Sequence, residues 1–394
     1  MWRSLASNAM TILIVLGLAG AFAVHWGKSQ FLAQGPLQEA ICFQVPQGAN
    51  IRGVADQLEE RGAISSARIF RLGAEYNDRS HLLKAGSFLI PEGTPMVGVV
   101  AIVTEAGRST CGTEINYRIG ITIAEAIVRE LDPTTNRYEE IVKFEAGAEE
   151  IPQEYLDARD EADVRFRVTL AEGVTSWHVV DGLRKADFLS GEIAEVPPEG
   201  TLAPDSYEVT RDSKRSELLA EMTRRQGVIL SDLWAERAAD LPIDTPEEAL
   251  ILASIVEKET GIAAERPEVA SVFINRLNQG MRLQTDPTVI YGITNGEGTL
   301  GRGLRRSELD RPTEFNTYQI DGLPPTPIAN PGRDAIAAAL NPAEGDYLYF
   351  VADGTGGHAF SRTLDEHNAN VARWRQIEAE RGAEAAGNAS TGGN

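Results

Sequence analysis

The sequence predicts an α+β protein with one apolar helix at its N-terminus and a mixed helix–strand domain toward its C-terminus. Three observations support this prediction: an uncharged apolar run at residues 9–26, strand-like segments that pass at a Gly into helix-like segments, and a strongly apolar helical segment near residue 250. The 394 residues, of which 42% are hydrophobic and 24% charged, suit two or three globular domains of about 150 residues each.

The N-terminal run AMTILIVLGLAGAFAVHW carries no charge between Arg3 and Lys28. Its length just suffices for a helix to cross about 30 Å of hydrocarbon. A cleaved signal peptide is the alternative, but the apolar core of such a peptide is usually shorter, about 7–15 residues. We therefore expect a retained single transmembrane helix, with the cytoplasmic tip and span at residues 1–27 and a juxtamembrane stalk at residues 28–40. The positive-inside rule places the rest outside the inner (plasma) membrane, in the periplasm or outside the cell.

The charge balance excludes two classes of function. Lys and Arg total 37 against 58 Asp and Glu, which gives a formal net charge of −21. Such an acidic surface repels phosphate backbones, so we expect no nucleic-acid partner. It also repels anionic head groups, which excludes a polybasic patch as the membrane anchor.

The two cysteines, Cys42 and Cys111, both lie in the N-terminal third of the chain. In an exported protein, a disulfide between them would close a long loop, worth about 4 kcal/mol in the chain-entropy model. Two unrelated buried thiols are an equally good interpretation. Because no CxxC motif or Cys/His cluster occurs, the sequence predicts neither a structural zinc site nor another cofactor.

A strand–turn–helix pattern recurs after the apolar run. It occurs in ICFQVPQGANIRGVADQLEERGAI, in GSFLIPEGTPMVGVVAIVTEAG, in VRFRVTLAEGVTSWHVVDGLRKADFL and, more weakly, in INYRIGITIAEAIVREL. We expect one small α+β module at residues 41–110 and a second module or connector at residues 111–203. The pattern resembles LysM-like modules, which bind glycan in cell-wall proteins, and a common scaffold without a ligand is the alternative.

Residues 204–378 form the next predicted domain, and residues 379–394 a disordered tail. LAPDSYEV is typical of a turn into a strand, and we expect a helix over residues 214–241. The closing AERGAEAAGNASTGGN is small, polar and Gly-rich, a composition that indicates disorder.

The segment DTPEEALILASIVEKETG has the best-defined local structure. Thr245 precedes Pro246 and has Glu248 three residues on, which predicts a capping box at a helix start. The helix is apolar on most of its faces, so it should be largely buried. We expect it to stop near Gly261, a common residue at helix C-termini.

Two carboxylates, Glu257 and Glu259, lie in the last turn of this helix. The helical neighbours of Glu259 are aliphatic (Leu252, Ile255, Val256 and Ile262), whereas those of Glu257 are smaller and more polar. Apolar surroundings and the negative end of the helix dipole both raise the pKa of a carboxyl, toward the range useful for proton transfer. The pattern therefore favours Glu259 as the proton-handling group. A solvated pair on the helix rim, helped by Lys258, is the alternative.

Five blocks in order extend this pattern: ILASIVEKETG, VASVFINRL, GMRLQTDPTVIYG, FNTYQIDGLPPTPIANPG and YLYFVADGTGGHAF. Together they resemble the catalytic domain of the endolytic murein transglycosylase MltG (YceG-like) family. The resemblance implies a catalytic domain at residues 204–378 that cleaves peptidoglycan glycan strands between N-acetylmuramic acid and N-acetylglucosamine. It further implies 1,6-anhydromuramic acid ends, membrane-bound peptidoglycan synthases as partners, and Glu259 as the catalytic acid, with Glu257 in reserve.

Supporting residues are suggested by type within these blocks. The predicted substrate-binding groups are amides, hydroxyls, a carboxylate and aromatic rings, at Gln284, Thr285, Asp286, Tyr291, Asn316, Thr317 and Tyr318. Asp286 is suited either to stabilising an oxocarbenium-like transition state or to forming a turn before Pro287. His358 is suited either to a place near substrate or to a plain hairpin turn.

Two other functions fit the same residues. One is an anchored cell-wall-binding protein in which the glutamate is structural. The other is a hydrolytic muramidase, which needs a second carboxylate across the cleft, and Asp286 is the suggestive candidate.

Overall fold

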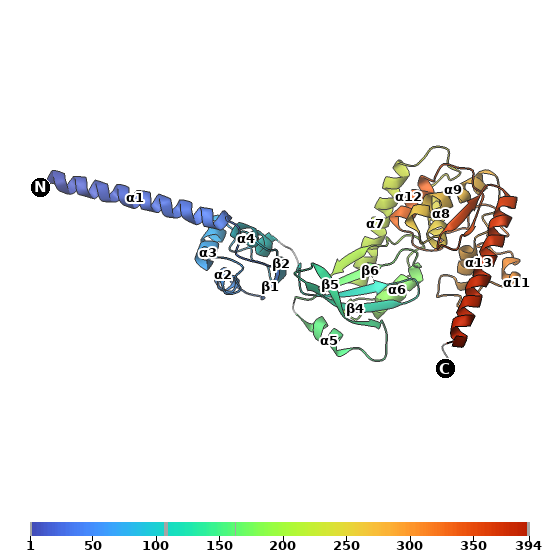
Figure 1. Cartoon of the computed structure of the whole chain (residues 1–394), viewed down its shortest axis with the longest axis horizontal. Coiled ribbons are helices and arrows are strands. Elements are labelled where there is room, and N and C mark those ends of the chain that lie inside the picture. Colours follow the sequence, from blue (N-terminus) through green and yellow to red (C-terminus); the bar gives the residue numbers. More distant parts are fainter. Residues whose placement is uncertain (1, 106–108, 162, 392–394) are drawn as a thin grey trace. The chain divides into compact units, whose positions relative to one another are not determined.

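The computed structural model describes residues 2–105, 109–161 and 163–391, and the chain divides into two compact units. The first unit comprises residues 1–116, 127–144 and 149–166, and the second comprises the remainder. The predicted boundary after residue 203 therefore falls inside the second unit. Mixed helices and strands make up both units, as expected for an α+β protein (Figure 1).

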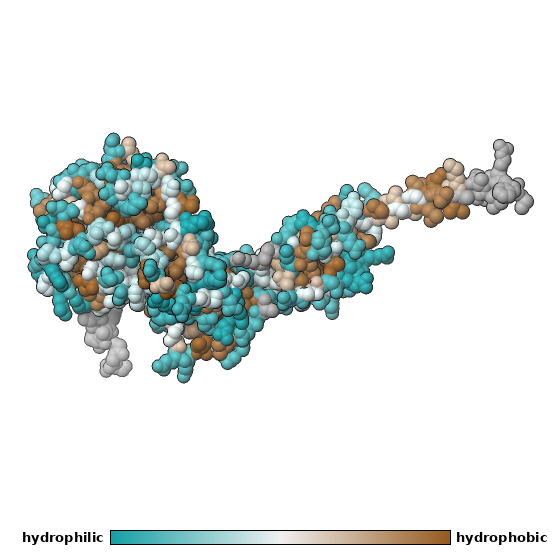
Figure 2. All heavy atoms as spheres, turned by 180° about the vertical axis from the view of Figure 1, so that it is seen from behind, coloured by the Kyte–Doolittle hydropathy of each residue, from teal (hydrophilic) through white to brown (hydrophobic). Residues whose placement is uncertain are grey.

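The N-terminal helix α1 runs from Trp2 to Leu32. Its segment Met10–Leu32 has a mean hydropathy of 1.8 and is long and apolar enough to cross a membrane. Many large hydrophobic side chains described along it, among them Ile12, Leu16 and Phe22, are exposed, and Figure 2 shows this part of the helix as a brown stretch. Residues 28–32 of the predicted stalk at residues 28–40 continue the helix. Phe31 is 6% exposed and packs in the core of the following module, which stabilises this extension.

The module after α1 combines a two-stranded sheet with three helices. Its elements are β1 (Ile41–Val45), α2 (Ile51–Glu60), α3 (Ala67–Tyr76), β2 (Gly86–Ile90) and α4 (Met96–Glu105). The antiparallel register pairs Cys42 with Leu89. Asn50 and Ser66 cap α2 and α3 by accepting hydrogen bonds from backbone N–H groups. Two of the predicted strand–turn–helix units, β1–α2 and β2–α4, are confirmed.

Cys42 and Cys111 form a disulfide that joins residues 69 positions apart, with 5.7 Å between their Cα atoms. It ties β1 to the segment that leaves the module. The same segment donates a hydrogen bond from the Thr110 N–H to the Ser87 carbonyl of β2 (2.8 Å). The sequence leaves open a disulfide or two separate buried thiols, and the structure contains the disulfide.

A five-stranded sheet follows, with the strand order β5-β4-β3-β6-β7. The strands are β3 (Thr113–Ile119), β4 (Ala124–Asp132), β5 (Arg137–Glu145), β6 (Arg165–Leu170) and β7 (Ser206–Val209). Helix α5 (Gln153–Asp160) precedes strand β6 in the chain, and helix α6 (Ser176–Lys185) follows it. The third predicted unit, β6–α6, is confirmed. The fourth is wrong, because its expected helix is strand β4. Ala126 and Val128 are buried at strand spacing, and pairing with β3 outweighs the helical spacing of the same stretch.

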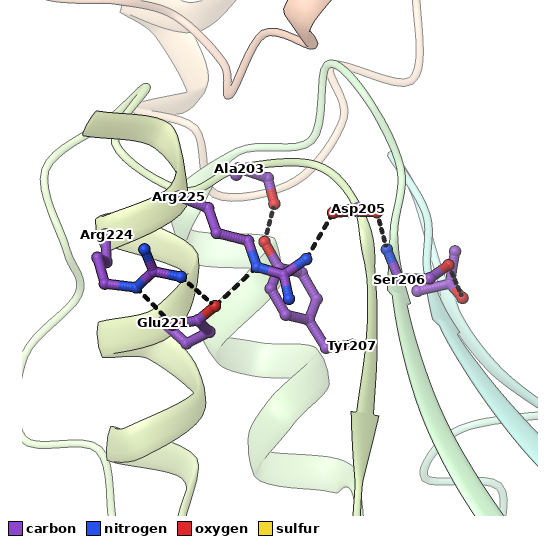
Figure 3. Close-up of polar contacts among 8 residues, drawn as sticks. Ala203, Asp205, Ser206, Tyr207, Glu221, Arg224 and Arg225 are labelled. Atoms are coloured by element: carbon purple, nitrogen blue, oxygen red, sulfur yellow. Dashed lines mark hydrogen bonds and ion pairs between the residues drawn. The ribbon is translucent and has the colours of Figure 1, made fainter. Parts of the chain in front are cut away.

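Strand β7 is locked to helix α7 (Arg215–Ala235) by the cluster in Figure 3. The Tyr207 hydroxyl donates to the Ala203 carbonyl (2.7 Å), and the Arg225 guanidinium lies 4.7 Å from the centre of the Tyr207 ring. Arg225 also donates to Asp205 (2.6 Å). The predicted strand at LAPDSYEV is confirmed. The helix predicted to end at residue 241 ends earlier, and Asp240 has a left-handed φ of 60° that no helix accommodates.

The rest of the second unit is mainly helical. It contains α8 (Pro246–Glu259), the 3-10 turn η1 (Ala263–Glu265), α9 (Arg266–Asn278), α10 (Asp286–Thr294), α11 (Arg306–Leu309), α12 (Arg333–Leu340), the hairpin β8 (Tyr349–Ala352) and β9 (His358–Ser361), and α13 (Leu364–Thr391). Helices α8, α9 and α12 share a core that includes Leu252, Phe273 and Ile336. This core fixes the C-terminal end of α8, where the two carboxylates lie.

The predicted disordered tail at residues 379–394 is helical as far as it is described. Helix α13 continues through Thr391, and residues 392–394 lie outside the described residues. Ala, Glu and Arg are strong helix formers, and in this stretch they outweigh the Gly and polar residues that indicate disorder.

Candidate active site

Helix α8 brings both carboxylates to one end of the core. Its capping box is confirmed: the Thr245 hydroxyl accepts from the Glu248 N–H (3.2 Å), and the Glu248 carboxylate accepts from the Thr245 N–H (3.3 Å). Its expected end near Gly261 is confirmed. Glu259 is the last helical residue, because Thr260 is already extended at φ −138° and ψ 131°. Glu259 therefore lies where the chain turns away from the helix.

Both oxygens of the Glu257 carboxylate are used within the protein. One lies 3.2 Å from Nη2 of the nearly buried Arg266, and the other accepts from the Gly332 N–H (2.9 Å). Arg266 also pairs with Glu172 (3.0 Å). The Glu257 side chain is only 6% exposed. These contacts join α8 to α9 and to the start of α12.

The Glu259 carboxylate contacts a different set of groups. The Thr285 hydroxyl donates a hydrogen bond to Glu259 Oε1. Three of the four predicted aliphatic neighbours, Leu252, Ile255 and Val256, are fully buried in the core. The fourth, Ile262, is 37% exposed, so the expectation that it buries the acid is wrong. The chain turns out of the helix after Glu259, which moves Ile262 away from its helical position.

Burial raises the pKa of Glu259 above the ordinary value of 4.5. The Thr285 hydroxyl opposes that shift, because its hydrogen bond stabilises the carboxylate. The negative charge of Asp286 raises this pKa further, and the charges of His358 and Arg276 lower it. Burial also raises the pKa of Glu257, while the Gly332 N–H and Arg266 lower it. Both carboxyls thus have raised pKa values, and they differ in that Glu259 contacts a neutral hydroxyl and Glu257 contacts a cation.

The segment before α10 presents Thr285 to Glu259. Gln284 has a left-handed φ of 52°, an uncommon conformation for a residue with a side chain. Its N–H donates to the Thr317 carbonyl (3.1 Å), and the Thr285 N–H donates to the Thr317 hydroxyl (3.0 Å). Thr285 is buried, whereas its neighbours Gln284 and Asp286 are exposed. The turn therefore holds one hydroxyl inward beside the acid and two polar side chains outward.

The sequence model of the YceG-like family matches residues 43–373. The chain belongs to the YceG-like family.

This YceG-like chain is similar to characterised relatives over most of its length. It is 27% identical to the endolytic murein transglycosylase of Bacillus subtilis (strain 168) over 357 residues, which is 89% of each chain. It is 26% identical to the endolytic murein transglycosylase of Streptococcus pneumoniae (strain ATCC BAA-255 / R6), over 94% of this chain but 65% of that longer one. A crystal structure of a yceG-like protein from Listeria monocytogenes has 25% identity and a TM-score of 0.45, and the match covers 84% of this chain and 99% of that one.

The other predicted binding residues of this YceG-like protein divide into two groups. Tyr318 contacts Asp286, because its hydroxyl donates to Asp286 Oδ1 (2.7 Å). Asn316 and Thr317 are fully buried, and the Asn316 amide donates to three backbone carbonyls, those of Glu308, Leu309 and Arg311. These two residues shape the turn rather than offer groups to a ligand.

Tyr291 points to a second polar cluster. Its hydroxyl donates to Glu199 Oε2 (3.3 Å), and Glu199 Oε1 accepts from the Ser176 N–H (2.8 Å). The fully buried Asn330 donates to the Val174 carbonyl (3.0 Å) and accepts from the Leu202 N–H (2.9 Å). Asn330 of the Pro-rich segment GLPPTPIANPG is thus buried and links this segment to the backbone at Val174 and Leu202.

The contact between Glu265 and His358 is absent from the sequence-based expectations. His358 Nδ1 lies 2.8 Å from Glu265 Oε2, and the His358 N–H donates to Glu265 Oε1 (2.9 Å). Two residues 93 positions apart give no local signal, so the pattern alone offers no way to pair them. The pair attaches the hairpin β8–β9 to the chain just after α8.

Proposed function

We propose that this YceG-like protein is a peptidoglycan lytic transglycosylase that is anchored in the membrane and cuts within glycan strands. It cleaves bonds between N-acetylmuramic acid and N-acetylglucosamine and leaves 1,6-anhydromuramic acid ends. The observation that carries the proposal is the half-buried carboxyl of Glu259, which the Thr285 hydroxyl contacts and whose pKa burial raises. Family membership and the two relatives, both endolytic murein transglycosylases, support the same substrate.

The reaction needs one carboxylic acid that acts twice. Neutral Glu259 donates its proton to the glycosidic oxygen as the bond from that oxygen to C1 of the muramic acid breaks. The resulting carboxylate then accepts the proton of the C6 hydroxyl, while O6 of the same sugar forms a bond to C1. The proton returns to Glu259, and water does not enter the product. Because Thr285 occupies Oε1, we assign the transferable proton to Oε2.

Asp286, Gln284 and Tyr318 are the proposed sugar-contacting residues. Asp286 and Gln284 are exposed on either side of Thr285, and Tyr318 is bonded to Asp286. The negative charge of Asp286 keeps the pKa of Glu259 raised and would stabilise positive charge that develops at C1. Thr285 holds the acid, Thr317 holds Thr285, and Asn316 fixes the turn that carries Thr317.

In this proposal, α1 and the first module hold the catalytic domain near the membrane. We propose that α1 is a retained anchor in the inner (plasma) membrane and that the catalytic domain lies outside. The module at residues 41–110 would act as a LysM-like glycan-binding unit. An enzyme so placed would cut strands as they leave membrane-bound peptidoglycan synthases and so terminate their elongation.

Digestion of purified peptidoglycan in water enriched in oxygen-18 tests the reaction type. We expect new ends that are 1,6-anhydromuramic acid, without the heavy isotope, by mass spectrometry. Reducing ends that carry one heavy oxygen would instead establish a hydrolytic muramidase and would give Asp286 the role of base or nucleophile. Digestion with a known muramidase under the same conditions is the control for isotope uptake.

A further inference from the structure

Helix α1 enters the first module without a flexible joint. It stays helical to Leu32, and Phe31 shares a buried core with Phe70 and Ala74 of α3. The ring of Phe31 lies directly over Gly73, where even a Cβ atom would come within 2.3 Å of it. Leu32 is also the last residue of the apolar segment. The face of α3 that adjoins α1 therefore begins at the membrane surface, wherever α1 spans the bilayer (Figure 1).

This part of the chain differs from the rest in charge. Residues 1–105 contain eight Lys and Arg and eight Asp and Glu, so the whole net charge of −21 arises after residue 105. Within the neutral part, three arginines surround one pocket of about 360 Å³ between α2 and α3. They are Arg52, Arg68 and Arg71. An anion would thus meet far less repulsion here than elsewhere on the protein.

Two of the three arginines that line the pocket have no ion-pair partner within the described residues. Arg71 lies 3.5 Å from Asp56, and Glu75 also lines the pocket. Over the described residues, neither Arg52 nor Arg68 forms an ion pair, and both are exposed. Guanidinium groups bind phosphate oxygens through paired hydrogen bonds, which makes a phosphate group the best-matched ligand.

Apolar side chains extend from the same helix face. Leu72 also lines the pocket and is 57% exposed, and Tyr76, one turn further, is 91% exposed. Arg68, Leu72 and Tyr76 are each four residues apart, so they lie along one side of α3. Basic, aliphatic and aromatic side chains in one row are typical of a surface that rests at the boundary between head groups and acyl chains.

We propose that the pocket of Arg52, Arg68 and Arg71 binds the phosphate of an anionic phospholipid in the membrane that α1 spans, with Leu72 and Tyr76 in contact with the interface. The proposal rests on the anchoring proposed above. The bound head group would fix the orientation of the module on the bilayer. The acidic remainder of the chain, which an anionic surface repels, would then be directed away from it.

The test uses the full chain in lipid nanodiscs, with Leu72→Cys labelled by a fluorophore. The native cysteines are joined as a disulfide, so the new thiol is labelled selectively. Discs of phosphatidylcholine, with or without about a third phosphatidylglycerol, carry a quencher on a trace lipid head group. We expect at least about twofold stronger quenching in the anionic discs, decreasing as salt is raised.

Charge reversal at the pocket supplies the decisive comparison. Arg52→Glu with Arg68→Glu should abolish the dependence on phosphatidylglycerol. Arg373→Glu with Arg375→Glu, two exposed arginines of α13, is the matched control and should retain it. Equal quenching in both lipids, or an unchanged response after reversal at the pocket, overturns the proposal. A chain that fails to co-elute with the discs overturns the anchoring as well, so the two failures are distinguishable.

Discussion

The two carboxylates at the end of α8 have the same chemistry and lie two residues apart, yet their surroundings differ. Glu257 faces Arg266 and the Gly332 N–H, which occupy both of its oxygens. Glu259 faces the Thr285 hydroxyl on one oxygen. The Glu257 carboxylate joins three segments of the core. The Glu259 carboxylate is held by Thr285, which lies between the exposed residues Gln284 and Asp286.

A raised pKa by itself does not distinguish these residues. Burial raises the pKa of both Glu257 and Glu259. The difference lies in their partners, because Arg266 and the Gly332 N–H oppose the rise in the pKa of Glu257, whereas Glu259 has no cation in direct contact within the described residues. A candidate catalytic acid is therefore better recognised by two features together: a raised pKa and the absence of an ion-pair partner.

Glu259→Gln should have the largest effect on catalysis. The amide keeps the size of the side chain but has no proton to give, so release of anhydromuropeptides should fall by about 10³-fold or more. Liquid chromatography with mass spectrometry measures that release, and circular dichroism checks the fold. Wild-type release from a folded variant would contradict Glu259 as the catalytic acid and would turn attention to Glu257.

Glu257→Gln should chiefly cost stability. Arg266 would lose a charged partner in a nearly buried position, so the free energy of unfolding should fall by about 1–3 kcal/mol. Denaturant titration measures the change. Activity of the folded variant should stay within about tenfold of wild type, since general acid catalysis is typically worth more. An inactive variant of unchanged stability would exchange the roles of the two glutamates.

The pH profile should move upward in Thr285→Val. Activity needs protonated Glu259, so it declines as the pH rises through the pKa of this group. Removal of the hydroxyl removes a bond that stabilises the carboxylate, so the pKa rises and the basic limb shifts to higher pH. A shift to lower pH would contradict the hydrogen-bond assignment.

Asp286→Asn should move the same limb the opposite way. Its negative charge raises the pKa of Glu259, so neutralising it should shift the basic limb to lower pH. Tyr318→Phe is the matched control, because it removes the 2.7 Å hydrogen bond and keeps the charge. Equal pH profiles for Asp286→Asn and wild type would mean that the charge of Asp286 does not affect the pKa of Glu259.

The smallest expected effect is on the pH dependence of stability. The pKa of Glu259 in the folded protein lies above 4.5, so its neutral form stabilises the fold below that pH. That contribution is lost as the pH rises through the folded pKa. The stability of wild type relative to Glu259→Gln should therefore decline with rising pH, as measured by thermal unfolding across a pH series. A constant difference would contradict the raised pKa.

Local signals gave the sequence-based predictions their successes. The capping box at Thr245 and the apolar face of α8 are properties of neighbouring residues. The choice of Glu259 over Glu257 rests on the same kind of local signal and stays a prediction. Where distant segments decide the outcome, the same reasoning failed. Strand β4 exists because β3 pairs with it, and Glu265 meets His358 across 93 positions. Asn316 was predicted to bind sugar, but its amide is taken up by backbone carbonyls that only the folded turn assembles.

Direct titration of the Glu259 carboxyl tests the central claim most closely. Carbon-13 NMR of protein labelled at glutamate side-chain carboxyls, compared with Glu259→Gln, isolates the signal of this one group. We predict that this signal titrates at a pH clearly above 4.5. A carboxyl that titrates at or below 4.5 would be ionised where the enzyme needs its proton, and would contradict the account.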